Sequence, residues 1–214
     1  MRHTFWSVLV AAAAILMTAG LSSRAVEASP LGKAPRTSIV VRTYTQSAVA
    51  GDIRTARRTA SAILGRAGIQ VFWLECALPA AVTADDPCAQ PLRRNELLVR
   101  ILFAGSVDSR PHVDTLGFAF VDLETGRGSL ATVYADRVAV MALGAGIDAA
   151  ELLGRTMAHE VGHLLLGTNR HAPHGLMRAS WSSADLRRNR ATQWLFGGSE
   201  GEMMRRGIAD RIAS

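Results

Sequence analysis

The sequence predicts an α+β fold, built from a mixed sheet of about five strands, a backing helix, a long central helix and C-terminal helices. Three observations support this prediction. β-branched and aromatic residues are concentrated in five separate runs, which is typical of strands. Apolar residues recur at helical spacing after the first run. Three patterns that cap helices follow the last run.

The first half of the chain supplies the backing helix and most of the sheet. We expect strands at 38–46, 69–76, 96–103, 115–122 and 131–142. Between the first two, Asp52 can cap a helix whose apolar residues from Ile53 to Leu64 recur at helical spacing. That helix should end near Gly65 or Gly68.

The second half is predicted to be helical. Asp148 and Glu151 form a capping-box pattern, and the helix that begins there should run to about Leu166 and stop at Gly167. A second capping box at residues 182–185 predicts a helix through about residue 196. A third pattern at residues 199–202 predicts a short last helix.

The N-terminal residues 1–28 have the pattern of a secretory signal peptide. A basic start precedes an apolar run of about fifteen residues, and small residues end at Ala28. The apolar run is too short to span a bilayer comfortably, although an uncleaved anchor is the alternative. We therefore expect residues 29–214 to form a single secreted domain, extracellular or periplasmic, without stable membrane insertion after cleavage.

The two cysteines, Cys76 and Cys88, flank a loop with prolines and paired aspartates. In an oxidising compartment they would form a disulfide, whereas two buried thiols are the alternative. The net charge of +6 comes almost entirely from arginines that are scattered along the chain. A nucleic-acid interface needs its basic residues on one stripe with aromatics between them, so we expect no nucleic-acid partner.

The segment HEVGHLLLGTNRH, residues 159–171, contains the densest group of possible metal ligands. Residues four apart share one face of a helix, so His159 and His163 can present imidazole nitrogens to one zinc ion. The opposite stripe is apolar and should face the core. This arrangement makes the predicted long helix a zinc-binding active-site helix, with Glu160 placed to take a proton from a zinc-activated water.

The segment resembles the metzincin class of zinc metallopeptidases, whose motif HExxHxxGxxH is followed by a methionine turn. The resemblance implies that Gly167 makes the turn, that His171 is the third zinc ligand and that Met177 packs beneath the metal. Here one extra residue lies on each side of Gly167, which leaves His174, or a carboxylate such as Asp185, as an alternative third ligand.

The same resemblance implies that the strand at 115–122 is the sheet edge above the cleft, where it could pair with an extended peptide. An interior strand is the alternative. We expect His112 to be a loop residue, and Trp181 and Trp194 to belong to the core or to the cleft wall.

These observations predict a secreted zinc-dependent metalloendopeptidase that hydrolyses peptide bonds through a zinc-activated water. Zinc would bind to His159, His163 and His171, and Glu160 would act as general base. The expected partner is a peptide or protein substrate, and the sequence carries no signal of oligomeric state. The alternatives are a zinc-stabilised secreted binding module without peptidase turnover, and a zinc hydrolase acting on a non-peptide amide or ester.

Overall fold

The computed structural model describes residues 37–45, 50–76, 86–103 and 115–213. The predicted signal peptide, part of the loop between the cysteines and His112 lie outside these residues. Within the described part, no helix is both long enough and apolar enough to span a membrane.

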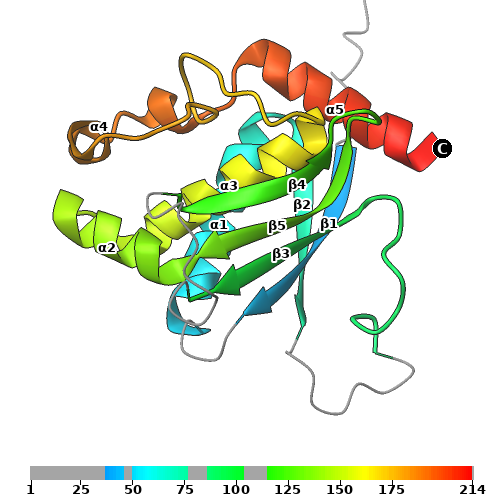
Figure 1. Cartoon of the computed structure of the whole chain (residues 1–214), viewed down its shortest axis with the longest axis horizontal. Helices are drawn as coiled ribbons and strands as arrows, with labels where there is room; N and C mark the ends of the chain where they lie inside the picture. Colours follow the sequence, from blue (N-terminus) through cyan, green and yellow to red (C-terminus); the bar gives the residue numbers. More distant parts are fainter. Residues whose placement is uncertain (1–36, 46–49, 77–85, 104–114, 214) are drawn as a thin grey trace, which may run out of the picture. The chain divides into compact units, whose positions relative to one another are not determined.

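A mixed sheet of five strands forms the centre of the fold, in the order β2-β1-β3-β5-β4 (Figure 1). The strands are β1 (Thr37–Thr45), β2 (Ile69–Cys76), β3 (Glu96–Leu102), β4 (Gly117–Asp122) and β5 (Arg127–Tyr134). Strands β2, β1, β3 and β5 run parallel to one another, while β4 pairs antiparallel with β5. The predicted α+β class and the mixed sheet are confirmed, and β4 is an edge strand.

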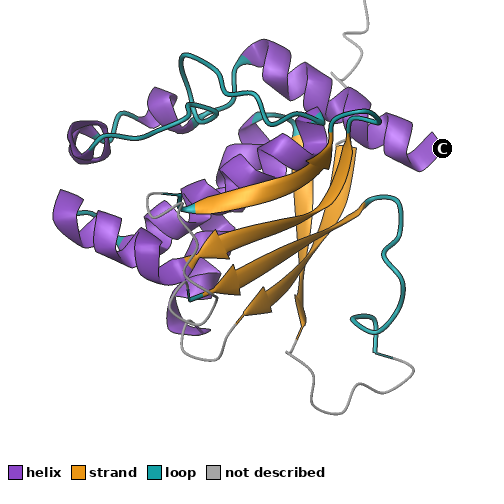
Figure 2. Ribbon diagram, viewed as in Figure 1, coloured by secondary structure: helices purple, strands orange, loops and turns teal. Residues whose placement is uncertain are grey.

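Helices α1 and α3 cover one face of this sheet (Figure 2). The helical elements are α1 (Ala50–Arg66), α2 (Ala135–Ala145), α3 (Ala149–Leu166), α4 (Ser183–Arg188), the 3-10 helix η3 (Ala191–Trp194) and α5 (Gly198–Ala213). Almost the whole circumference of α3 is buried, because the sheet, α1, α2 and α5 all pack against it. The helix with the histidines is therefore the best-anchored element of the fold.

The prediction of a strand at 131–142 is wrong for the second half of this range. Strand β5 ends at Tyr134, and helix α2 begins at Ala135. The buried residues of this segment, Val138, Ala142 and Ala145, are four and three apart, which is helical rather than strand spacing. The valines that suggested a strand are shared between the two elements.

Three helix boundaries also differ from expectation. Helix α1 begins at Ala50, so Asp52 lies inside its first turn rather than before it. The helix expected to reach residue 196 ends at Arg188, because Asn189 adopts the left-handed conformation with φ 41°. The final helix, α5, runs for 16 residues instead of being short, because it buries Met204 and Ile208 one turn apart.

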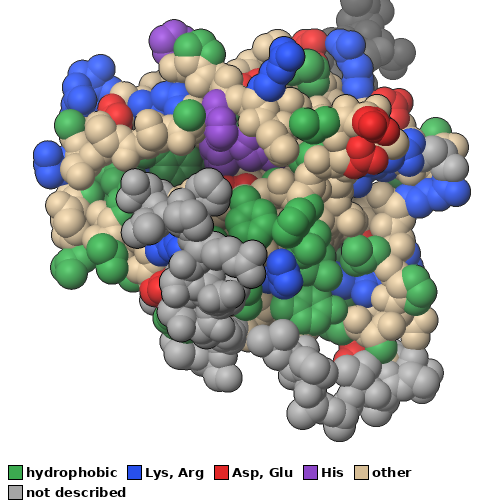
Figure 3. Space-filling view, viewed as in Figure 1, with side chains coloured by type: hydrophobic (Ala, Val, Ile, Leu, Met, Phe, Trp, Pro, Cys, Tyr) green, Lys and Arg blue, Asp and Glu red, His purple; other side chains and the backbone are tan. Residues whose placement is uncertain are grey.

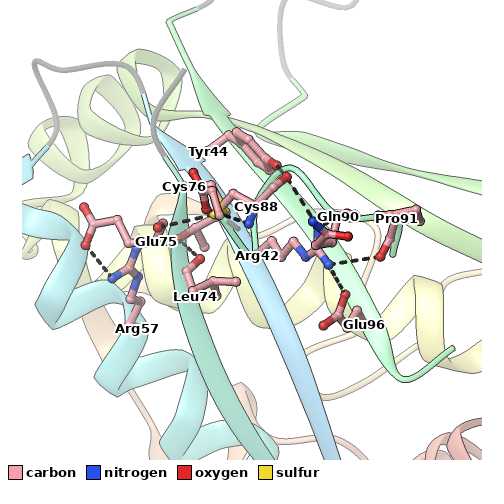
Figure 4. The surroundings of a disulfide bond; sticks show 12 residues. Arg42, Tyr44, Arg57, Leu74, Glu75, Cys76, Cys88, Gln90, Pro91 and Glu96 are labelled. Carbon is pink, nitrogen blue, oxygen red and sulfur yellow. Dashed lines mark hydrogen bonds and ion pairs between the residues drawn. A yellow bond between two sulfur atoms is a disulfide. The ribbon is translucent and has the colours of Figure 1, made fainter. Parts of the chain in front are cut away.

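The predicted disulfide between Cys76 and Cys88 is confirmed, with 5.7 Å between the two Cα atoms (Figure 4). The segment after Cys88 is also bound to the sheet through Arg42, a buried residue of β1. The Arg42 guanidinium donates to the carbonyls of Gln90 (2.6 Å) and Pro91 (3.2 Å) and forms an ion pair with Glu96. Covalent and polar contacts together hold this otherwise irregular segment on the sheet.

Candidate metal centre

Helix α3 presents the predicted metal ligands, and its ends are those expected from the sequence. The Asp148 side chain accepts a hydrogen bond of 2.7 Å from the backbone N–H of Glu151. At the other end, Gly167 adopts φ 65°, and its N–H donates to the carbonyl of His163. The helix therefore stops one turn after its second histidine, and the chain can fold back toward the site.

Three histidines converge at this point. The Nε2 atoms of His159 and His163 are 3.0 Å apart. The chain after Gly167 brings His171 to them, so that one potential ligand atom from each residue lies within 4.8 Å of the other two. The two extra residues in the spacing do not prevent this convergence. In the part of the chain that the structure describes, His174 and Asp185 do not belong to such a group.

The inner two rings are oriented by backbone carbonyls. Nδ1 of His159 lies 2.9 Å from the carbonyl oxygen of Leu176, and Nδ1 of His163 lies 2.8 Å from that of Thr168. A carbonyl oxygen only accepts hydrogen bonds, so each Nδ1 must carry the proton and donate it. This tautomer leaves the Nε2 lone pairs free for a metal ion, which is the usual arrangement around ligating histidines.

Burial keeps the histidines in the neutral form that binds metals. Desolvation, followed by the charge of His163, lowers the pKa of His159 to about 3. Desolvation also lowers the pKa of His163 and of the more exposed His171. Three neutral imidazole donors are a ligand set that Zn²⁺ favours, so the residues present fit Zn²⁺.

Glu160 is the buried carboxylate beside these ligands. Only 4% of its surface is exposed, and desolvation raises its pKa to about 8. Its Oε2 atom has no hydrogen-bond partner within the described residues. A buried carboxylate without a partner costs free energy, and such groups are concentrated at functional sites. A divalent cation at the histidines would lower this pKa again and favour the carboxylate form.

Gly117 allows the edge strand to pass close to that carboxylate. A Cβ atom built on Gly117 would lie 2.9 Å from Oε1 of Glu160 and 2.7 Å from the carbonyl oxygen of Thr132. Neither distance is compatible with a side chain, so this position requires glycine. Sequence reasoning missed Gly117, although a glycine inside a strand is a known signal for the close approach of another group.

Met177 packs against Gly162 of α3. Its side chain is buried, and its Sδ would lie 2.8 Å from a Cβ atom built on Gly162. Gly175 adopts φ 74° two residues earlier, and the next residue, Leu176, donates to the carbonyl of Leu195 at 2.9 Å. These contacts hold the turn that contains Met177 in place. The same turn includes Leu176, whose carbonyl orients the ring of His159.

The three histidines and Glu160 line a cavity of about 560 Å³. Its other walls come from β4 and the two residues before it, from Met141 of α2, from Thr156 and Asn169, and from residues 178–181 after the methionine. Trp181 is a wall residue, whereas Trp194 is buried behind it with 5.4 Å between the ring centroids. Figure 3 shows histidine side chains grouped at the surface, next to hydrophobic side chains on the face in view.

No protein-family model matches this sequence, and no curated protein matches it. Among solved structures, a zinc-dependent peptidase from Methanocorpusculum labreanum aligns over 77% of this chain and 99% of its own, with 17% sequence identity and a TM-score of 0.49. Archaemetzincin from Methanopyrus kandleri aligns over 84% of this chain and 98% of its own, with 16% identity and a TM-score of 0.47. Both structures resemble this chain only in the broad outline of the fold.

Proposed function

We propose that this chain is a secreted zinc-dependent metalloendopeptidase that hydrolyses peptide bonds in peptide or protein substrates. One observation carries the proposal: three neutral imidazoles converge beside a buried carboxylate, Glu160, one of whose oxygens has no partner in the described structure. The proposal rests on the geometry of this chain.

In the proposed site, His159, His163 and His171 hold the zinc ion. When bound, zinc lowers the pKa of a water molecule and polarises a carbonyl group. The chain supplies ring orientation through the carbonyls of Leu176 and Thr168, which keep the Nε2 atoms directed at one point. Preorganised ligands of this kind bind metal without losing further side-chain freedom.

Glu160 provides the proton transfer that peptide hydrolysis requires. As a carboxylate it takes a proton from the attacking water, and as a carboxylic acid it passes that proton to the leaving nitrogen. The close approach of Gly117 limits the positions that this buried side chain can take. Burial opposes the charged form of Glu160, which favours the uptake of the proton that the second step requires.

The edge strand β4 supports a peptide as substrate. It pairs on one side with β5, and residues from Thr115 to Ala119 line the cavity. An edge strand offers unpaired backbone N–H and C=O groups to which an extended peptide can add as a further strand. This placement favours peptides over small amides or esters, which have no backbone to pair with the strand.

The proposed setting is the periplasm or the extracellular space, with residues 29–214 as the mature single domain. The disulfide is compatible with an oxidising compartment of this kind. A secreted binding module that uses zinc only for stability is disfavoured, because such a module has no need of the buried Glu160. A buried carboxylate oxygen without a partner destabilises the fold, and such groups are concentrated at functional sites.

The variant Glu160→Gln tests the proposal, because it keeps the size of the side chain and removes its ability to accept a proton. We expect the variant to retain zinc at the level of the unaltered chain and to lose about 100- to 10,000-fold in peptide hydrolysis. Zinc content is measured by elemental analysis, and hydrolysis by mass spectrometry of a peptide mixture with and without chelator. Equal turnover by both proteins would refute the assignment of Glu160.

A further inference from the structure

Arg178 follows Met177 and lines the same cavity as the histidines and Glu160. Its Nε donates to the carbonyl of Gly175 at 3.2 Å, and Nη1 lies 3.3 Å from a carboxylate oxygen of Asp185. The remaining nitrogen, Nη2, is buried and has no hydrogen-bond partner among the described residues. The guanidinium is therefore held in position with part of its hydrogen-bonding capacity unused.

The charges around Arg178 do not balance. Asp185 is shared, because Arg188 also lies 3.6 Å from its other carboxylate oxygen. One carboxylate thus faces two guanidinium groups, which leaves a net charge of +1 in this cluster. Among the described residues, the charged side chains that line the cavity are Arg178 and Glu160, so Arg178 is the cationic side chain that this lining offers to a substrate.

The surroundings strengthen an electrostatic interaction at this position. The Arg178 side chain is only 19% exposed, and its Cζ lies 6.0 Å from the ring centroid of buried Trp194. Met141 and Trp181 provide further apolar lining. Charges attract each other more strongly where such groups exclude water, and a hydrogen bond between a guanidinium and a carboxylate is stronger than one between neutral groups.

We propose that Arg178 determines specificity by selecting substrates that carry a carboxylate next to the cleaved bond. The inference rests on the proposed function, because the cavity that contains Glu160 must also receive the bond to be cut. The carboxylate belongs either to an acidic side chain that flanks this bond or to the free C-terminus of a substrate cut close to its end. Both sources offer Arg178 the same group.

The test uses the zinc-loaded mature protein and pairs of peptides that differ only by glutamate or glutamine on one side of a cleaved bond. We expect glutamate to raise kcat/KM by about 10- to 100-fold on one side of the bond. A second set of peptides, shortened to end at that residue, compares a free with an amidated C-terminus. A preference confined to free C-termini would assign the site to the terminal carboxylate.

Substitutions at Arg178 and at Asp185 should change this preference in opposite directions. Arg178→Met should remove it, whereas Arg178→Lys should retain part of it because the charge remains. Asp185→Asn should increase it, since Arg178 would lose its competing partner. Arg206→Met is the matched control, because Arg206 is an exposed arginine on α5 that pairs with Glu202 and lies outside the cavity lining. This control should leave the preference unchanged.

Binding to the zinc-loaded Glu160→Gln variant gives the same comparison without turnover. We expect calorimetry to show about 10-fold tighter binding of the glutamate peptide than of the glutamine peptide, and equal binding once Arg178→Met is added. Cleavage with equal kcat/KM for every pair would overturn the role of Arg178 and leave the peptidase intact. Selective binding without any cleavage by the unaltered protein would overturn the peptidase and leave the carboxylate site intact.

Discussion

Gly117 on β4 lies directly against Glu160 on α3, and a Cβ atom at Gly117 would come within 2.9 Å of Oε1 and 3.1 Å of Cγ. A peptide could bind to this edge strand, and Glu160 is the carboxylate that could transfer a proton during hydrolysis. The contact therefore links these two parts of the site. Because the backbone itself approaches the side chain, the position of Glu160 depends on the absence of any side chain at residue 117.

Gly117→Ala should therefore displace Glu160 or β4. We expect it to destabilise the fold by about 1–3 kcal/mol and to lower peptide hydrolysis by about 100-fold, since a shift of 1 Å at a catalytic group has effects of that size. Gly144→Ala is the control, because no atom lies within 4 Å of a Cβ atom at this helical position. Urea unfolding measures the stability of the two variants, and peptide assays measure their hydrolysis. A Gly117→Ala protein with unchanged stability and hydrolysis would contradict the contact.

Removal of the metal should weaken the fold as well as abolish hydrolysis. A ligand that binds only the folded state adds about 2.7 kcal/mol at 100 times its dissociation constant. Thermal unfolding with zinc and with chelator should thus differ by several degrees. If the two transitions coincide while zinc remains bound in the first sample, the site does not stabilise the folded chain.

His171 and His174 should respond differently to substitution. His171→Ala removes one of the three converging nitrogens and should weaken zinc binding by at least about 10-fold. His174→Ala should leave zinc binding unchanged, because His174 is exposed and lies outside this group. Competition with a zinc-sensitive dye measures both affinities. The reverse order of effects would make His174 the third ligand.

Gly162 should tolerate no side chain, because a Cβ atom there would lie 2.6 Å from the ring of Phe196 and 2.8 Å from Sδ of Met177. Gly162→Ala should destabilise the fold by about 1–3 kcal/mol and reduce zinc affinity through the displaced turn. Gly65→Ala, in the open last part of α1, should be neutral or stabilising by up to about 1 kcal/mol. Similar unfolding curves for the two variants would argue against close packing at Gly162.

Loss of the disulfide should affect stability rather than the metal site. Replacing both Cys76 and Cys88 by serine should cost about 3 kcal/mol, as expected for a short closed loop. Zinc content should stay the same, because neither cysteine belongs to the histidine group. Urea unfolding and elemental analysis check the two statements, and a fall in zinc content would show coupling between the two regions.

The sequence alone determined the elements whose signals are local. The bounds of α3 follow from the cap at Asp148 and the left-handed Gly167, and both were predicted because capping depends on residues within one turn. The placement of His159 and His163 on one face follows from helix geometry in the same way. Local rules failed at 131–142, because a short run of valines suits a strand as well as a buried helix.

Only the tertiary structure decided which distant residues meet. It brought His171 to the helical histidines despite the longer spacing, and it excluded His174 and Asp185 from that group in the part of the chain it describes. It also placed Gly117 against Glu160, and Arg178 in the wall of the cavity. These contacts depend on how the sheet, α3 and the following turn pack together, and packing is a property of the whole core that no short stretch of sequence specifies.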